Sequence, residues 1–168
     1  MMLECGCPGE YPDWHRQNID LAFHAAHVLP IASFLHMPLS YETYKQRQQH
    51  EIEQLDLQER WPGFALTRTG WLRGKMIRLL EDSESPSRHF QHLGADFQVQ
   101  GFLHEGGIGT LRKSIRKQQE LLLDSGRMPK EMYLAYLTCP RCAESRGGDR
   151  ILLVRRWTSS RRLAQKTG

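Results

Sequence analysis

All four cysteines of this 168-residue chain stand in two tight pairs, one near each end of the sequence. Cys5-Gly-Cys7 lies close to the start, and Cys139-Pro-Arg-Cys142 lies close to the end. Four thiols at this spacing, with none left over, predict a site in which four thiolates surround one metal ion tetrahedrally. Such a site would join the two ends of the chain, so metal binding would be part of folding.

Disulfides, or thiols that stay unlinked, are the alternatives to a metal. A Cys-x-Cys disulfide would close a small strained ring, and pairing across the chain ends needs an oxidising compartment. The N-terminal residues lack the basic and apolar stretches of a secretory signal. Nothing in the sequence approaches the roughly 18 consecutive apolar residues of a membrane helix. We therefore expect a cytoplasmic protein with reduced thiols and no membrane partner.

The Cys-Pro-x-Cys turn at residues 139–142 resembles the knuckle of zinc ribbons and rubredoxin-like sites. This resemblance, which covers the turn alone, implies a closed structural site in which a tight turn directs two thiolates at one metal ion. Zinc is the default metal, while mononuclear iron or an iron–sulfur cluster takes the same sulfur ligands. The first pair is one residue shorter than in a ribbon. If one of its cysteines does not bind, His15 could supply a nitrogen ligand instead.

Hydrophobic periodicity predicts one α+β domain over residues 1–157, followed by a basic, mobile tail over 158–168. We expect two main helices and an antiparallel sheet of about five strands. Residues 14–29 are ambiguous, and a helix or irregular structure is favoured over a strand there. No internal repeat is visible in the sequence. The expected helices run from Ser40 to about Leu57 and from Thr110 to Gly126, and the expected strands cover residues 64–69, 75–80, 97–104, 132–137 and 151–157.

A glycine-rich loop before the second expected helix is a candidate anion site. Its glycines leave backbone N–H groups uncovered, and the following helix N-terminus carries partial positive charge. Cations in the first turns of a helix oppose its dipole at a cost of a few tenths of a kcal/mol each, which a bound anion would reverse. A tight turn followed by a solvated basic helix face is the alternative. The candidate ligand-binding residues are Gly106, Gly107, Gly109, Thr110, Arg112 and Lys113.

Charge is distributed unevenly along the chain. Residues 1–60 carry a net charge of −5, whereas residues 61–168 carry a net charge of +9. This asymmetry favours an anionic partner for the later part of the chain: a phosphorylated ligand, a nucleic acid or an acidic protein surface. Aromatic residues do not interleave with the basic run at 112–117, which weakens the case for single-stranded nucleic acid.

A second hypothesis makes the chain a metal-dependent hydrolase. On a helix, Asp20, His24 and His27 would fall on one face, and two histidines with a carboxylate are typical ligands of an open catalytic metal site. That interpretation requires a helix over these residues. The sequence therefore predicts, first, a small cytoplasmic protein closed by zinc that binds an anionic partner and, as the alternative, a hydrolase with a His/Asp-coordinated metal.

Overall fold

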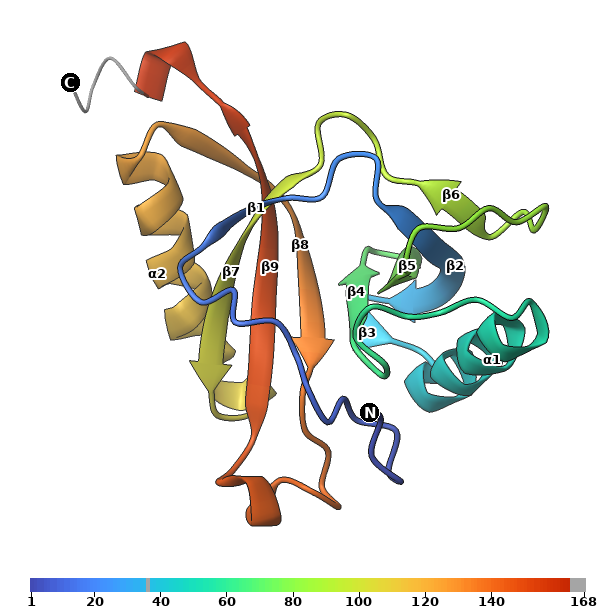
Figure 1. Ribbon diagram of the computed structural model, residues 1–168. Helices are drawn as coiled ribbons and strands as arrows, with labels where there is room; N and C mark the ends of the chain where they lie inside the picture. Colours follow the sequence, from blue (N-terminus) through green and yellow to red (C-terminus); the bar gives the residue numbers. More distant parts are fainter. Residues whose placement is uncertain (36, 164–168) are drawn as a thin grey trace.

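The structure, a computed structural model, describes residues 1–35 and 37–163 (Figure 1). Within these residues, nine antiparallel strands form one sheet in an α+β arrangement with two long helices, which is larger than the five strands expected. Eight strands follow the order β1-β7-β9-β8-β4-β5-β2-β3, and β6 pairs with β2. The elements are β1 (Asn18–Asp20), β2 (Ala25–Phe34), β3 (Met37–Pro38), α1 (Tyr41–Gln54), β4 (Ala65–Thr69), β5 (Arg73–Leu79), β6 (Phe90–His92), β7 (Gln98–Glu105), α2 (Leu111–Asp124), β8 (Arg127–Tyr136) and β9 (Arg150–Ser159), with short 3-10 turns at Ile108–Thr110 and Glu144–Arg146.

Of the helix or irregular structure favoured over residues 14–29, only the irregular part is right, because this segment forms β1 and the start of β2 with irregular chain between them. In β2, buried Leu29 and Ile31 alternate with exposed Pro30 and Ala32, which is the period of a half-buried strand. Pro30 pairs with Lys75 of β5, and neither β6 nor β3 pairs with Pro30 on the opposite side. A proline at an open edge removes no hydrogen bond from the ladder, so it does not end the strand.

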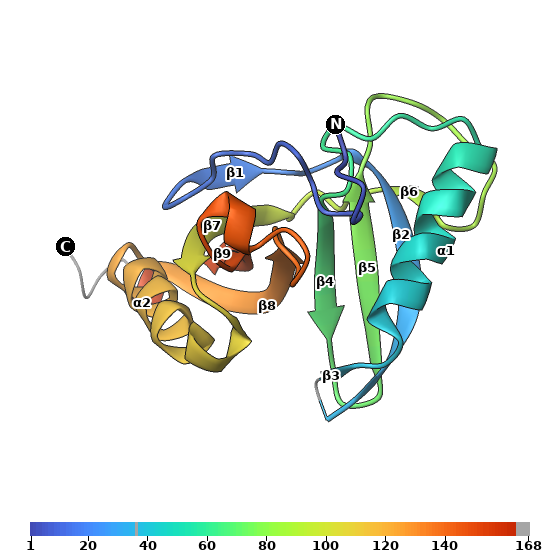
Figure 2. The ribbon, with the colours of Figure 1, turned by 90° about the horizontal axis from the view of Figure 1, so that it is seen from below.

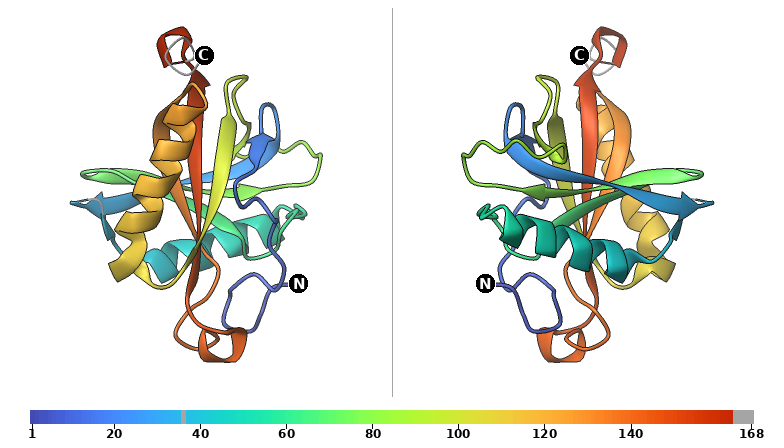
Figure 3. Two further views of the ribbon diagram at one scale, coloured as in Figure 1. Left: turned by 90° about the vertical axis from the view of Figure 1, so that its left-hand side faces the viewer. Right: turned by 90° about the vertical axis from the view of Figure 1, so that its right-hand side faces the viewer.

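The fold contains a repeated arrangement that the sequence does not show. The order strand–helix–strand–strand occurs first as β2-α1-β4-β5 and again as β7-α2-β8-β9. The sheet order is correspondingly symmetric, with β2-β5-β4 in one half and β7-β9-β8 in the other. The halves meet where β4 pairs with β8 through Thr67 and Leu134, and the two half-sheets are turned steeply against each other (Figures 2 and 3).

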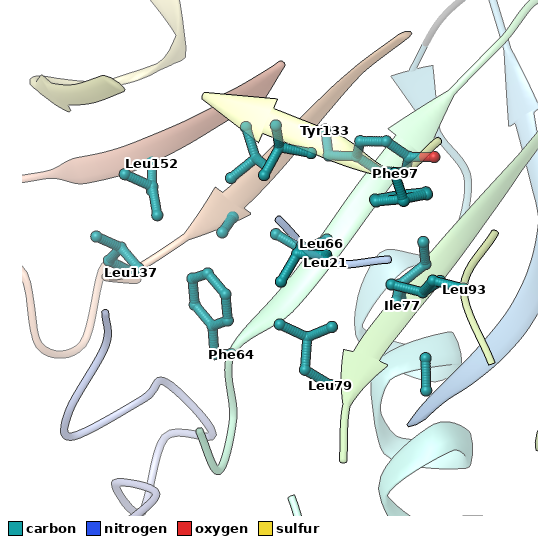
Figure 4. Packing of buried hydrophobic residues seen from close by; sticks show 14 residues of the cluster. Leu21, Phe64, Leu66, Ile77, Leu79, Leu93, Phe97, Tyr133, Leu137 and Leu152 are labelled. Carbon is teal, nitrogen blue, oxygen red and sulfur yellow. The ribbon is translucent and has the colours of Figure 1, made fainter. Parts of the chain in front are cut away.

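The largest apolar core joins these two halves (Figure 4). Its buried members come from strands and loops of both halves, whereas α1 and α2 pack over smaller separate clusters. Each helix buries the stripe expected from its periodicity, including Gln48 and Ile52 in α1 and Gln118 and Leu122 in α2. The labelled core residues in Figure 4 are Leu21, Phe64, Leu66, Ile77, Leu79, Leu93, Phe97, Tyr133, Leu137 and Leu152.

The helix caps and the chain end differ in detail from expectation. Ser40 and Thr110 occupy the N-cap positions, but neither side chain makes a cap hydrogen bond. Ser40 has a left-handed backbone (φ 54°) rather than the extended one that capping requires, and Thr110 Oγ1 donates to the Gly107 carbonyl oxygen. The expected tail begins inside β9, and residues 164–168 lie outside the described residues. No helix in the described part of the chain is both long and apolar enough to span a membrane.

Candidate functional site

The four cysteines lie together at one end of the molecule. The N-terminal segment and the β8–β9 connection run side by side there (Figures 1 and 3), and all four Sγ atoms are within 4.8 Å of one another. Each pair is presented by a tight turn. Gly6 takes a left-handed conformation (φ 88°) between the first two cysteines. In the second pair, the backbone N–H groups of Cys142 and Ala143 donate to the Cys139 carbonyl oxygen.

The environment of the sulfur atoms suits thiolate ligands. Burial opposes ionisation of Cys139, but the backbone N–H groups of Arg141 and Cys142 favour the thiolate, and its pKa is lowered to about 7. Burial, followed by hydrogen bonds from the other three cysteines, raises the pKa of Cys7. Four sulfur atoms at this separation need shared protons or a shared cation between them. Four thiolates are also the ligand set of one tetrahedral metal ion, so these residues fit such an ion.

A cleft of about 660 Å³ separates the cysteine cluster from one flank of α1. Two buried cations line it. Lys45 Nζ donates to the Gly6 carbonyl oxygen over 2.7 Å, which holds the Cys5–Cys7 turn against the helix. Arg78 donates to Glu59 over 2.7 Å and to Gln49 over 2.8 Å. The cleft is lined by Met2, Glu4, Cys5, Gly6, Glu42, Lys45, Gln46, Gln49, His50, Glu53, Arg78, Cys139, Pro140 and Arg141.

A second cluster of ionisable side chains lies on the opposite flank of α1. His27 comes from β2, Glu51 from α1 and His89 from the turn before β6. His27 Nε2 is 2.9 Å from Glu51 Oε2, and His89 Nδ1 is 2.7 Å from the same oxygen atom. His27 is fully buried, while 23% of the Glu51 side chain and 12% of the His89 side chain are exposed. Two imidazole rings therefore bind one carboxylate oxygen at the edge of the protein interior.

Gln48 fixes the proton on His27. The Gln48 Nε2 amide lies 3.1 Å from the His27 carbonyl oxygen and 2.9 Å from the Met76 carbonyl oxygen, so it must donate to both. Both N–H groups of this amide are thereby used, and its nitrogen lies 3.0 Å from His27 Nδ1, where it offers no acceptor for a proton on that ring nitrogen. His27 consequently carries its proton on Nε2 and donates it to Glu51.

The charges of the cluster follow from these contacts. Burial lowers the pKa of His27, against the opposing effect of Glu51, so His27 is neutral near neutral pH. Burial also opposes ionisation of Glu51, but the hydrogen bonds from His89 and His27 outweigh it and lower the pKa of that carboxyl. Glu51 is thus a carboxylate that orients His89. Both side chains border a hollow of about 220 Å³, whose other lining residues are Gln54, Leu55, Ser87 and Arg88.

Among the described residues, Asp20, His24 and His27 do not form a common metal-ligand cluster. The helix on which Asp20, His24 and His27 were to share a face is absent, since β1, a turn and β2 occupy that segment. Asp20 Oδ1 accepts hydrogen bonds from the backbone N–H of Ala22 and from Gln98. His27 joins residues that sequence reasoning missed, Glu51 and His89. These residues follow no regular spacing in the sequence, because they lie on three separate segments that meet only in the folded chain.

The basic helix start forms a third candidate site. A hollow of about 540 Å³ is lined by four of the six predicted residues, Gly109, Thr110, Arg112 and Lys113, together with Arg116, Lys117 and Glu120. The other two are placed differently. The Gly106 backbone N–H donates to the Asp149 carbonyl oxygen over 2.8 Å, and the carbonyl oxygen of Gly107 lies 3.0 Å from His104 Nε2.

Comparison with known proteins gives a family and a fold. The model of a family described as bacterial hydrolase matches residues 3–157. Two solved structures are similar to the chain. The EcmrR C-terminal domain has a TM-score of 0.62 at 11% identity, covering 85% of this chain and 95% of that chain. The EcmrR–DNA complex in EcmrR-RPo has a TM-score of 0.57 at 10% identity, with coverage of 85% and 56%. A search of curated proteins finds no match.

Proposed function

Because this chain belongs to the bacterial hydrolase family, we propose that it is a hydrolase with His89 as its general base. The observation that carries the proposal is the pair of short contacts, 2.7 and 2.9 Å, by which His89 and His27 hold one oxygen of Glu51. A carboxylate that accepts from Nδ1–H of a histidine leaves Nε2 of that ring able to take a proton.

The proposed reaction uses the hollow beside His89. His89 Nε2 removes a proton from a water molecule as that water attacks the substrate, and Glu51 stabilises the imidazolium that forms. The same imidazolium then gives its proton to the leaving group. His27 has a positioning role: because it is neutral and donates to Glu51, it holds the carboxylate without competing as a second positive charge. Arg88, at the edge of the hollow, would stabilise negative charge developing on the substrate.

The test is hydrolysis of a panel of chromogenic carboxylic esters, phosphoesters and amides. We expect His89→Gln to lower kcat/KM by about 10²–10⁴-fold, the usual contribution of a general base. His92→Gln, on the exposed part of β6, is the matched control and should leave activity unchanged. Glu51→Gln should lower kcat, because the carboxylate no longer stabilises the imidazolium that forms on His89. Full activity in His89→Gln, in a protein that hydrolyses any of these substrates, would refute the assignment.

A metal-dependent reaction at the same cluster is the second candidate. The ligand atoms of His27, Glu51 and His89 lie within 4.8 Å of one another, and two histidines with a glutamate are the ligands of open zinc sites. We place it second because a metal on His27 Nε2 would force its proton onto Nδ1, opposite the Gln48 amide N–H groups. Elemental analysis distinguishes the two: a second metal per chain that disappears in His89→Gln favours the metal-dependent reaction.

We further propose that Cys5, Cys7, Cys139 and Cys142 bind one structural zinc ion, with iron as the other candidate. The clustering of the four sulfurs supports this, and a reducing cytoplasm would keep all four available as thiolates. The metal would close the fold and leave no open ligand position for catalysis. Elemental analysis of the purified protein identifies the metal. A disulfide detected by mass spectrometry in protein prepared without reductant, together with no bound metal, would refute the proposal.

The hollow at the start of α2 supports a site for an anionic partner. Four cations, the two residues Gly109 and Thr110 just before α2, and a single carboxylate, Glu120, surround it, and this net positive lining suits a phosphate group or a nucleic acid backbone. We expect inorganic phosphate and a short DNA duplex to bind with an affinity that falls steeply with salt. The double variant Arg112→Ala, Lys113→Ala should abolish this binding, whereas Arg60→Ala, an exposed arginine elsewhere, should not. Binding that ignores ionic strength would contradict the proposal.

A further inference from the structure

Two neighbouring loops project together from the half of the molecule that contains α1 (Figures 2 and 3). One loop joins β2 to β3 and the other joins β4 to β5. The backbone N–H groups of Ser33 and Leu35 donate to the carbonyl oxygens of Leu72 and Trp71, over 3.1 and 2.9 Å. Ser33 Oγ also donates to the Gly70 carbonyl oxygen over 2.8 Å. The two loops are therefore held as one surface.

This surface is apolar and exposed. Met37 and Trp71 are 69% and 62% exposed, and Leu72 is 59% exposed. Monomeric proteins rarely leave so many large apolar side chains together in water unless the patch contacts something else. We call this surface the apolar tip, and it consists of Phe34, Leu35, Met37, Leu39, Trp71 and Leu72.

The two segments that build the apolar tip carry only positive formal charges. The two segments that build it, residues 31–41 and 62–80, contain no aspartate or glutamate. Exposed Arg68 and Arg73 flank Trp71 and Leu72 on the β4–β5 hairpin. A second copy of this chain, packed tip to tip by a two-fold axis, would bring the same arginines towards each other. The tip therefore complements an apolar partner that carries negative charge.

We propose that the apolar tip docks on the surface of an anionic lipid membrane. Tryptophan favours the membrane–water interface, and leucine, phenylalanine and methionine side chains can enter the acyl boundary. The two arginines would then lie at the level of the negatively charged headgroups. Docking of this kind is peripheral and needs no spanning helix. It is independent of the proposed hydrolase site, which lies at Glu51 and His89 rather than at these loops.

Vesicle sedimentation tests the proposal. The full chain should sediment with vesicles made of equal parts phosphatidylglycerol and phosphatidylcholine, should bind less at high salt, and should not bind pure phosphatidylcholine. The double variant Trp71→Ser, Leu72→Ser should lose this binding. Arg73→Glu changes the charge by two units, and each charge near an anionic surface is worth about fivefold in affinity, so we expect a loss of roughly 25-fold.

Two matched controls separate the apolar tip from other surfaces. Phe23→Ser removes a side chain that is 67% exposed in the turn before β2, at the far end of that strand, and should bind vesicles normally. Arg60→Ala removes an exposed arginine outside the apolar tip and should also bind normally. Circular dichroism of each variant confirms that the fold is retained.

Three results would overturn the proposal. The first is no sedimentation with phosphatidylglycerol vesicles. The second is normal vesicle binding by the Trp71→Ser, Leu72→Ser variant. The third is a dimer seen by light scattering that this tip variant converts to a monomer, since a second copy of the chain would then cover the apolar tip.

Discussion

The buried ion pair between Arg78 and Glu59 gives the sharpest test of how α1 is held on the sheet. Arg78 on β5 is fully buried, and the Glu59 side chain is 5% exposed. The guanidinium also donates to Gln49 of α1 and, over 3.3 Å, to the Lys45 carbonyl oxygen. Removing Glu59 alone would leave a buried cation with neutral partners only, which is far costlier than losing an exposed ion pair.

From this geometry we expect Glu59→Leu to lower the free energy of unfolding by about 3 kcal/mol, the lower end for breaking a buried pair. With a urea slope of about 2 kcal/mol per M, the midpoint should fall by about 1.5 M. Arg78→Met should cost a similar amount, because it leaves Glu59 and the Gln49 amide oxygen unpaired. The double variant removes both charges and should cost less than the sum of the two single changes by about 2 kcal/mol.

Urea unfolding followed by circular dichroism, with zinc present throughout, measures all three variants. Arg60→Met is the matched control, since that arginine is exposed beside Glu59 and should change the midpoint little. If Glu59→Leu lowered the free energy of unfolding by less than about 1 kcal/mol, Glu59 would not be the group that compensates the buried charge of Arg78. Additive costs in the double variant would equally contradict the reasoning.

Three further changes test other parts of the structure. Cys142→Ser should reduce bound metal below one ion per chain by elemental analysis and lower the Tm, because metal binding is coupled to folding. Leu66→Ala should cost about 3 kcal/mol in urea unfolding, since Leu66 is fully buried in the shared core. A hydrogen bond from Arg156, outweighing partial burial, lowers the pKa of Glu131 from 4.5 to about 2. The stabilising effect of the ionised Glu131 carboxylate is therefore complete above pH 4.5 and is lost as the pH falls towards 2. The urea midpoints of the wild type and of Glu131→Gln should converge over that pH range.

Local hydrophobic patterns predicted both long helices and five of the nine strands. The helices α1 and α2, the β4–β5 hairpin and strands β7 and β9 all lie where the periodicity indicated. Strand β2 was missed because its first residues, Ala25, Ala26 and His27, are all buried, and its alternation starts only afterwards. Strand β6 has three residues, too few to show any period. The strands without a counterpart among the five predicted ones are β1, β2, β3 and β6.

The candidate sites also differ in how well the sequence predicts them. The cysteine cluster could be predicted because its chemistry is written as two short motifs, and the structure needs only to bring the chain ends together. The hydrogen-bonded cluster could not, because His27, Glu51 and His89 are each separated by more than 20 residues and meet through the pairing of β2 with β6 and the packing of α1. One signal in the sequence is Gln48, a polar residue on the same helix face as Ile52, since a buried amide needs a polar partner.

The short pairing between β4 and β8 bears on how the two half-sheets can bend relative to each other. A single residue pair connects the two half-sheets there, whereas β7 and β9 share seven pairs. Side-chain packing across the core, rather than a backbone ladder, therefore sets the angle between the halves. Bending along this line would therefore break few backbone hydrogen bonds and would be resisted mainly by the packing of the shared core. The thiol cluster joins the chain's start, which Lys45 holds against α1 of one half, to the β8–β9 connection of the other half, so a metal ion bound there would link the two halves and restrict such bending.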